Sequence, residues 1–428
     1  MHNLPKSATL HYNNRMILKA FAVAVLLASL AACAPARTAT PLATPSLIPT
    51  ETAAPASPTP LPTLVPTLTL TPLPSATPTQ TPFPTINLEV TVWPSEPVVP
   101  ILLYHQFNIA NTGISTVMKV RLDDFRSRLQ ALYDSGYSLV RLEDWLNGQL
   151  QAPAGRRPLI LTIDDVFTNS QIALLPDGNP SPKTGIGVLW QFSQEHPDFG
   201  FHVALFTNLN APFDNPDNPL KEEVKARTIV WCIEHDAIPY NHLWGHPRLS
   251  ITSVKNIPLV AQKNDEALRQ YLHLVNRDDL VAKVANIIAL PEGLWPATKD
   301  GVKALLAYHN PEGQPLLAVM EAMTPYDFLL LKIPKYLLPP YAAGFEPFHI
   351  PRMDGSPLVI DFLVKNKEQF PAAQACTLSV IDPRHQDEPA YLKQRLQNNR
   401  GACPEGVYAL KGMLLRVTSA GVEQLYPK

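Results

Sequence analysis

Short apolar runs alternate with stretches of helical periodicity through the middle of the chain. Five runs are too short for helices and predict buried strands, at residues 99–103, 137–140, 159–163, 201–206 and 237–240. Between the first two runs, apolar residues recur at helical spacing from Leu122 to Leu132, and Gly136 follows as a helix-ending residue. Strands that alternate with helices predict a parallel α/β fold with its chemistry at the carboxyl ends of the strands.

Two adjacent carboxylates, Asp164 and Asp165, stand directly after the apolar run 159–163, and two histidines four residues apart, His242 and His246, follow the run 237–240. One carboxylate and two imidazoles form a ligand set for a divalent metal, and the second carboxylate is then left to act as a base. Taken alone, the aspartates would more often form a turn or a helix cap, and the histidines would more often lie in the core or on the surface. Together they indicate a hydrolase site.

Charge and composition narrow the class of protein. The net charge of −2 over 428 residues leaves no basic footprint for nucleic acid. Of the 46 prolines, 16 lie in residues 34–97, together with Thr, Ser and Ala. Because proline at this density disfavours helices and sheet ladders, the segment 34–97 is predicted to be a disordered, semi-rigid tether.

Residues 1–33 are predicted to be an export signal. A short apolar run, too short for a membrane span, ends in Leu30-Ala31-Ala32-Cys33, which resembles the lipobox of bacterial lipoproteins. The resemblance implies that Cys33 is lipidated and that the protein is exported and anchored to the outer face of the bacterial cell membrane. An ordinary secretory signal is the alternative.

Five motifs in order resemble those of the polysaccharide deacetylase family, the NodB-homology domain. They are Leu102-Leu103-Tyr104-His105, the helix and strand from Phe125 to Tyr137, Thr162-Ile163-Asp164-Asp165, His242-x-x-x-His246-Pro247 and Ala289-Leu290-Pro291-Glu292-Gly293. The resemblance covers residues 98–365. It implies a distorted (β/α) barrel, a divalent metal that is often zinc, and removal of acetyl groups from N-acetylated polysaccharides.

The resemblance also implies roles for individual residues. Asp164 corresponds to the catalytic base, and Asp165, His242 and His246 correspond to the metal ligands. In the turn formed by Pro291, Glu292 and Gly293, a backbone N–H would assist at the oxyanion, and Arg352 resembles an arginine that orients the base.

Three positions depart from the family pattern: Val166 replaces a glycine, Leu243 a serine or threonine, and Glu292 a tyrosine. Because a β-branched residue disfavours positive φ, Val166 predicts a different loop path. The family's late Leu-x-x-His motif, which supplies a general acid, has no convincing match. His309 in the segment 306–309 and His349 are the two candidates.

Other residues have two interpretations each. His105 and Trp295, like Trp244, are candidate substrate contacts, with core packing as the alternative. Cys376 and Cys403 are predicted to form a disulfide in an exported protein, whereas Cys232 is predicted to be a buried thiol. The run 358–364 is predicted to be the closing barrel strand, and residues 366–428 a small C-terminal extension with a hairpin around Lys411-Gly412.

The sequence therefore predicts a lipid-anchored, metal-dependent N-deacetylase acting on an envelope or extracellular polysaccharide or a peptidoglycan-like glycan. Two alternatives remain. The first is a catalytically degenerate barrel that binds glycans, and the second is a hydrolase of another non-peptide amide.

Overall fold

The computed structural model describes residues 85–95, 97–168, 170–210, 221–323, 339–342, 344–380, 382–399 and 403–426. The predicted signal segment, Cys33 and the tether up to residue 84 lie outside the described residues. Residues 79–428 form one compact unit. In the described ranges, no helix combines the length and the apolar character that crossing a membrane requires.

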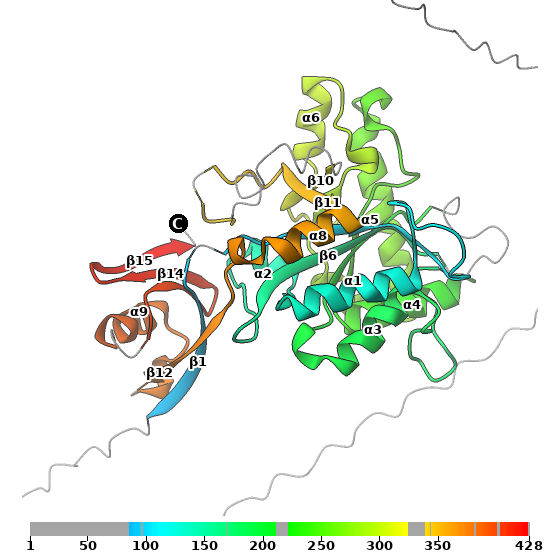
Figure 1. Cartoon of the computed structure of the whole chain (residues 1–428). Helices are drawn as coiled ribbons and strands as arrows, with labels where there is room; N and C mark the ends of the chain where they lie inside the picture. The colour runs from blue at the N-terminus through cyan, green and yellow to red at the C-terminus, as the bar shows by residue number, and fades with distance from the viewer. Residues whose placement is uncertain are drawn as a thin grey trace, which may run out of the picture. The chain divides into compact units, whose positions relative to one another are not determined.

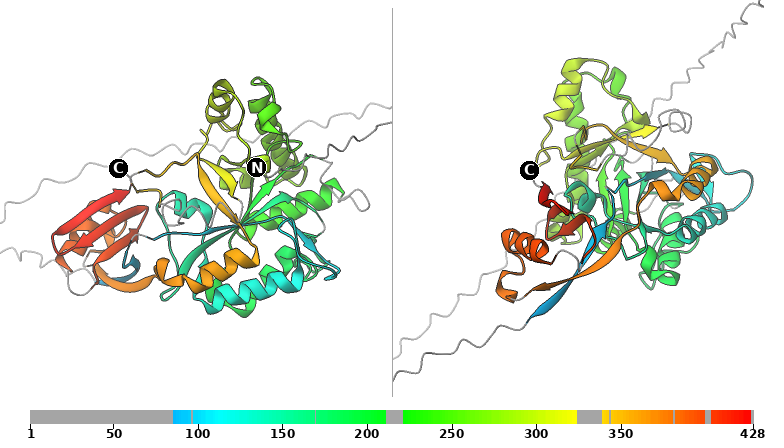
Figure 2. Two further views of the ribbon diagram at one scale, coloured as in Figure 1. Left: turned by 45° about the horizontal axis from the view of Figure 1, so that its top comes forward. Right: turned by 60° about the vertical axis from the view of Figure 1, so that its left-hand side comes forward.

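The main sheet has eight parallel strands in the order β2-β11-β10-β9-β8-β7-β6-β5 (Figures 1 and 2). β2 pairs with β6 as well as with β11, so the sheet closes on itself and β5 remains beside the first half of β6. β8 and β9 share a single paired position, Asn241 with Ile288. The structure thus confirms the predicted distorted (β/α) barrel. Its strands are β2 (Ile101–Tyr104), β5 (Tyr137–Leu139), β6 (Arg157–Val166), β7 (Val203–Thr207), β8 (Ala237–Asn241), β9 (Ile287–Ala289), β10 (Ala318–Met323) and β11 (Ile350–Asp354).

Helices surround this sheet. α1 packs against α3 and α8, and α4 packs against α5 (Figure 1). Side chains of Thr184, Thr298 and Ser356 cap α3, α6 and α8 by accepting from backbone N–H groups. The helices are α1 (Leu122–Asp134), α2 (Leu142–Leu146), α3 (Gly185–Glu195), α4 (Glu222–Glu234), α5 (Asn256–Leu274), α6 (Lys299–Leu306) and α8 (Pro357–Lys365). Two short strands, β3 (Gln106–Asn108) and β4 (Lys119–Arg121), pair with each other.

The five predicted strands are confirmed as β2, β5, β6, β7 and β8. β6 shows why the strands could be predicted from the pattern of apolar residues. Every residue from Pro158 to Val166 is buried, because a parallel strand with helices outside and the barrel interior inside faces no water. The one polar residue before the aspartates, Thr162, donates its hydroxyl hydrogen to the carbonyl oxygen of Leu102 at 2.9 Å.

A second, antiparallel sheet has the order β12-β1-β13-β14-β15 and packs against α9 (Pro389–Asn398). Its hairpin turns at Lys411 and Gly412, as predicted, and both residues have positive φ. A disulfide joins Cys376 to Cys403, and Cys232 is a buried free thiol whose pKa is raised by burial. The strands are β1 (Ile86–Trp93), β12 (Gln374–Val380), β13 (Gly406–Leu410), β14 (Met413–Thr418) and β15 (Gly421–Tyr426).

The tether boundary at residue 97 was wrong. Residues 86–93 form β1, which lies between β12 and β13 in the second sheet (Figure 1). This stretch has no proline and alternates apolar with polar residues up to Val92, so it can donate to both neighbouring strands. Trp93 belongs to the buried cluster that includes the barrel core. The folded unit therefore needs the chain from before Ile86.

The prediction of a closing strand at 358–364 was also wrong, because these residues lie in α8. An apolar run of this length does not distinguish a strand from a helix. The local signal that decides is Ser356-Pro357: the serine side chain caps the helix and proline occupies its first turn. The strand that closes the ring is β11, which pairs with β2.

Candidate metal centre

Three neighbouring strands bring the predicted ligands to one end of the barrel. β6 carries Asp164 and Asp165 near its carboxyl end, and His242 directly follows β8. β7 lies between them, with Thr207 paired to Val166 on one side and to Asn241 on the other. Because the strands are parallel, their carboxyl ends meet at the same edge, and the two motifs converge although they are almost eighty residues apart.

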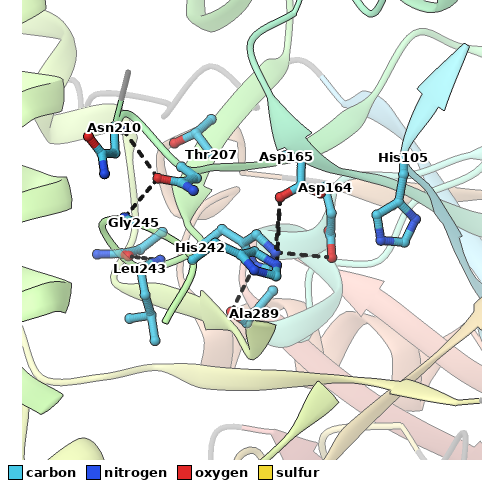
Figure 3. A network of polar contacts seen from close by, with 12 residues as sticks. His105, Asp164, Asp165, Thr207, Asn210, His242, Leu243, Gly245 and Ala289 are labelled. Atoms are coloured by element: carbon cyan, nitrogen blue, oxygen red, sulfur yellow. Dashed lines mark hydrogen bonds and ion pairs between the residues drawn. The ribbon is translucent and has the colours of Figure 1, made fainter. Parts of the chain in front are cut away.

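Asp165, His242 and His246 form a cluster whose ligand atoms all lie within 4.8 Å of one another. Asp165 Oδ1 is 3.7 Å from the Nε2 atom of each histidine (Figure 3). This oxygen is buried and has no hydrogen-bond partner among the described residues. A buried carboxylate oxygen facing two imidazole nitrogens fits a divalent cation, since two nitrogens and one oxygen are a common zinc ligand set with an open position.

His242 is oriented by its second ring nitrogen. Nδ1 lies 3.0 Å from the carbonyl oxygen of Ala289 in β9 and donates to it, which leaves Nε2 to face the carboxylates (Figure 3). Burial lowers the pKa of His242, and the nearby carboxylates do not fully offset this effect. A neutral imidazole with Nε2 unprotonated is the form that binds a metal.

Asp164 is held by Arg352 of β11 inside the barrel. Arg352 Nη1 donates to Asp164 Oδ1 at 2.5 Å and Nη2 donates to Oδ2 at 2.9 Å, and both side chains are almost fully buried. Burial alone would raise the pKa of Asp164, but the charge of Arg352, with His242 and the hydrogen bond from Arg352, lowers the pKa below its usual value. Asp164 is therefore an ionised carboxylate in a fixed orientation beside the cluster.

Left-handed backbone conformations are concentrated at this site. Asp165, Leu243, His246 and Glu292 all have φ between 47° and 59°. Val166 itself does not need a positive φ. It is the last residue of β6, and the residue before it, Asp165, adopts the positive φ. Leu243, which replaces a hydroxyl residue of the family pattern, is fully buried with Leu249 and Leu290, so its side chain contributes to packing.

Buried side-chain amides and one carboxylate support the loop 242–246 after β8, called the histidine loop below. The side chain of Asn241 accepts from the N–H of Leu243 at 2.8 Å and donates to Ala261 O and to Asp265 Oδ1. Tyr308 donates to the other oxygen of Asp265 at 2.6 Å. Burial raises the pKa of Asp265 to about 6. These contacts hold the left-handed turn that follows His242.

His105 lies on the other side of Asp164. In the register of β2 with β6, Tyr104 is opposite Ile163, so the next residues, His105 and Asp164, are neighbours (Figure 3). Gln171 Nε2 donates to the carbonyl oxygens of both residues, at 3.0 and 2.7 Å. His105 Nδ1 is buried and has no partner in the described part of the chain. The imidazole is thus beside the Asp164 carboxylate rather than in a distant part of the core.

His105 is predicted above only as a substrate contact or a core residue, and not as the histidine of a Leu-x-x-His motif. Leu102-Leu103-Tyr104-His105 has the same spelling, at the end of a strand, but it stands first in the chain instead of last. The structure gives its place in the ring: β2 is the neighbour of β11 and of β6. His309, the other residue with this spelling, follows α6 and is exposed.

The turn Pro291–Gly293 follows β9, next to the histidine loop. The Glu292 carboxylate accepts from Arg248 Nε at 2.9 Å and Nη2 at 3.2 Å, and this hydrogen bond lowers the pKa of Glu292. A Cβ at Gly293, which has φ of 66°, would lie 3.2–3.3 Å from atoms of Ala322, so the turn requires glycine.

His349 and Trp295 form a separate cluster with Glu321. His349 Nδ1 is 2.8 Å from Glu321 Oε1, Trp295 donates to the same oxygen, and the two rings are 4.7 Å apart. His349 precedes β11 and so lies at the amino end of that strand, whereas Asp164 and His242 lie at carboxyl ends. The structure therefore does not bring His349 to the cluster of Asp165, His242 and His246. Arg352 does lie beside that cluster, where it contacts Asp164.

No protein-family model and no curated protein matches the chain. Several solved structures are similar. The deacetylase PplD of Streptococcus pyogenes, in complex with acetate, is 15% identical over 64% of this chain and 98% of that chain, with a TM-score of 0.38. The chain is similar in structure to polysaccharide deacetylases. IcaB from Ammonifex degensii is 14% identical over 63% and 97% of the two chains, with a TM-score of 0.39. A CE4 family pseudoenzyme from Bacillus anthracis is 14% identical over 65% and 63%, with a TM-score of 0.25.

Proposed function

We propose that this protein is a metal-dependent carbohydrate N-deacetylase. The observation that carries the proposal is the convergence of the cluster Asp165, His242 and His246 beside an ionised, arginine-held carboxylate, Asp164. The cluster can bind a cation and Asp164 can accept a proton. Hydrolysis of an acetamide requires both.

A divalent metal held by the three ligands, for which zinc fits the donor set, supplies a Lewis acid and lowers the pKa of its water. Asp164 accepts a proton from the attacking water, and Arg352 keeps that carboxylate ionised and aimed. His105 donates a proton to the nitrogen of the breaking C–N bond. The products are acetate and a free amine on the sugar.

The substrate and the location belong to the same proposal. The lipobox-like end of the signal segment at Cys33 supports lipid anchoring on the outer face of the cell membrane, and the proline-rich tether supports reach. An enzyme held there meets N-acetylated glycans of the envelope. The turn at Pro291, Glu292 and Gly293, which flanks the cluster, supplies a backbone N–H and the Arg248–Glu292 ion pair to the sugar side of the site.

Metal content of the folded unit, residues 79–428, is the first test. We expect about one divalent ion per chain in the wild type and none in His242→Ala, because the variant removes the ligand whose tautomer is already set for binding. Elemental analysis after dialysis against zinc measures this. His273→Ala, at an exposed histidine, is the matched control and keeps the ion. A folded wild type that binds no metal contradicts the proposal.

Acetate release separates the proposal from its alternatives. Release of acetate from N-acetylglucosamine oligomers by the metal-loaded protein supports the deacetylase. Metal binding and glycan binding without release would instead indicate the degenerate, glycan-binding barrel. Release of acid only from amides without a sugar would indicate a hydrolase of another non-peptide amide.

His105→Gln is expected to lower kcat on N-acetylated sugars about 10²–10³-fold, because the leaving nitrogen then receives no proton. On 4-nitrophenyl acetate, whose leaving group needs no proton, the same variant is expected to lose less than 10-fold. Steady-state rates on both substrates, with metal content as the control, measure the difference. Equal losses on the two substrates would contradict a proton-donor role.

A further inference from the structure

Asn208 is a buried polar residue at the metal centre to which the sequence analysis gave no role. It directly follows Thr207, the last residue of β7, which is paired with Val166 of β6 and Asn241 of β8. Asn208 therefore lies between the ends of the two strands that carry Asp165 and His242. Its relative exposure is 1%.

The end of β7 lies beside the catalytic carboxylate. Phe206, two residues before Asn208, is opposite Asp164 in the register of β6 with β7. Its ring lies under the guanidinium of Arg352 at 4.9 Å, and Arg352 reaches Asp164 inside the barrel. Asn208 follows this part of β7, just past the last residue of the strand.

The amide of Asn208 has a determined orientation. Its Oδ1 accepts from the N–H groups of Gly245 at 3.0 Å and Asn210 at 3.2 Å (Figure 3). Because both partners are backbone donors, the oxygen must face them and Nδ2 must face away. Nδ2 is buried and has no hydrogen-bond partner among the described residues. A buried donor left unpaired is destabilising, so a partner is expected in the working protein.

The neighbouring asparagines differ from Asn208 in this respect. Asn241 and Asn264 each use both ends of the amide: Asn264 Nδ2 donates to Thr207 O at 3.0 Å, and its Oδ1 accepts from the N–H of Leu209 at 2.9 Å. Both the oxygen and the nitrogen of these two amides thus have hydrogen-bond partners within the protein, as expected for residues with a structural role. Asn208 combines a scaffold contact to Gly245, in the histidine loop, with an unused donor.

We propose that Asn208 Nδ2 donates a hydrogen bond to the acetyl oxygen of the substrate and to the oxyanion that develops there, an inference that rests on the proposed function. As water adds to the carbonyl carbon, the electron pair of the C=O bond moves onto that oxygen. A neutral amide donor stabilises this charge without giving up its proton. Asn208 thus adds a side-chain donor to the backbone N–H of the turn at Glu292.

Two variants of the full chain test the donor. Asn208→Asp keeps an oxygen for Gly245 and Asn210 but replaces the donor by an acceptor, and Asn208→Ala removes the donor without adding charge. We expect both variants to bind acetate, the reaction product, about 10-fold more weakly than the wild type in calorimetric titrations of the metal-loaded protein. We expect kcat on N-acetylglucosamine oligomers to fall about 10²-fold with KM nearly unchanged, and metal affinity to stay unchanged.

Asn264→Ala is the scaffold control: it is expected to lower Tm while acetate affinity stays at the wild-type value. Unchanged acetate affinity in both Asn208 variants, with an active wild type, overturns the inference alone. Weakened metal affinity with unchanged acetate affinity also overturns it, since Asn208 would then serve the Asp165 carboxylate. A wild type that neither binds metal nor releases acetate overturns the proposed function, and the inference with it.

Discussion

Asp164→Asn is expected to lower kcat for acetate release about 10³-fold while the protein still binds one metal ion per chain. An amide at this position cannot accept the proton of the attacking water, and general-base assistance contributes about 10²–10⁴-fold to such reactions. The proposed metal ligand, Asp165, is a different residue, with a left-handed backbone conformation. Steady-state rates and metal content of the same preparation measure the two effects.

Asp165→Asn is the matched comparison for that experiment. It is expected to lose the metal as well as the activity, because it alters the oxygen that faces both histidines. Together the two variants assign different roles to two adjacent carboxylates. If Asp164→Asn kept more than a tenth of the wild-type kcat, the base would have to be another group.

Much of the barrel could be predicted from the sequence because its strands are buried on both faces. β6 is the clearest case: every residue from Pro158 to Val166 is buried, and the run 159–163 within it leads directly into the two aspartates. The candidate metal ligands could be predicted for a related reason. Asp165 lies near the carboxyl end of β6 and His242 directly follows β8, so the local sequence already places them at the carboxyl edge of the sheet.

The errors arose where local sequence is compatible with more than one structure. Residues 358–364 are apolar except for Asp361, and the side that faces the core is defined only once α8 packs against α1. β1 was missed because it directly follows a proline-rich segment. Its partners, β12 and β13, lie about three hundred residues away, and no local pattern indicates a pairing of that range.

The residues that surround the cluster could not be predicted for the same reason. His105 is beside Asp164 because β2 pairs directly with β6, and Arg352 reaches Asp164 because β11 closes the ring on β2. Asn208 accepts a tertiary hydrogen bond from Gly245, and Asp265 accepts one from Asn241 at the end of β8. The sequence motifs identify the candidate ligands, whereas the order of strands in the ring decides which other side chains lie beside those ligands.

Arg352→Met is expected to lower the free energy of unfolding by about 3–5 kcal/mol, since it leaves the Asp164 carboxylate buried without its counter-ion. Arg352 is fully buried and Asp164 has a relative exposure of 2%, so solvent screens this pair little. Chemical denaturation of the metal-free folded unit measures the change. Arg384→Met, at an exposed arginine paired with Asp382, is the matched control and is expected to change stability by less than about 1 kcal/mol.

The double variant Asp164→Asn/Arg352→Met shows whether the loss arises from an unpaired charge. With both charges removed, the double variant is expected to be more stable than Arg352→Met alone, and additive losses would contradict the pairing. The pH profile gives a second test. Asp164 must be ionised to act as a base, and the charge of Arg352 helps to hold its pKa below the usual value against burial. Without Arg352 the pKa of Asp164 rises, so activity is expected to fall at a higher pH on the acid side than in the wild type.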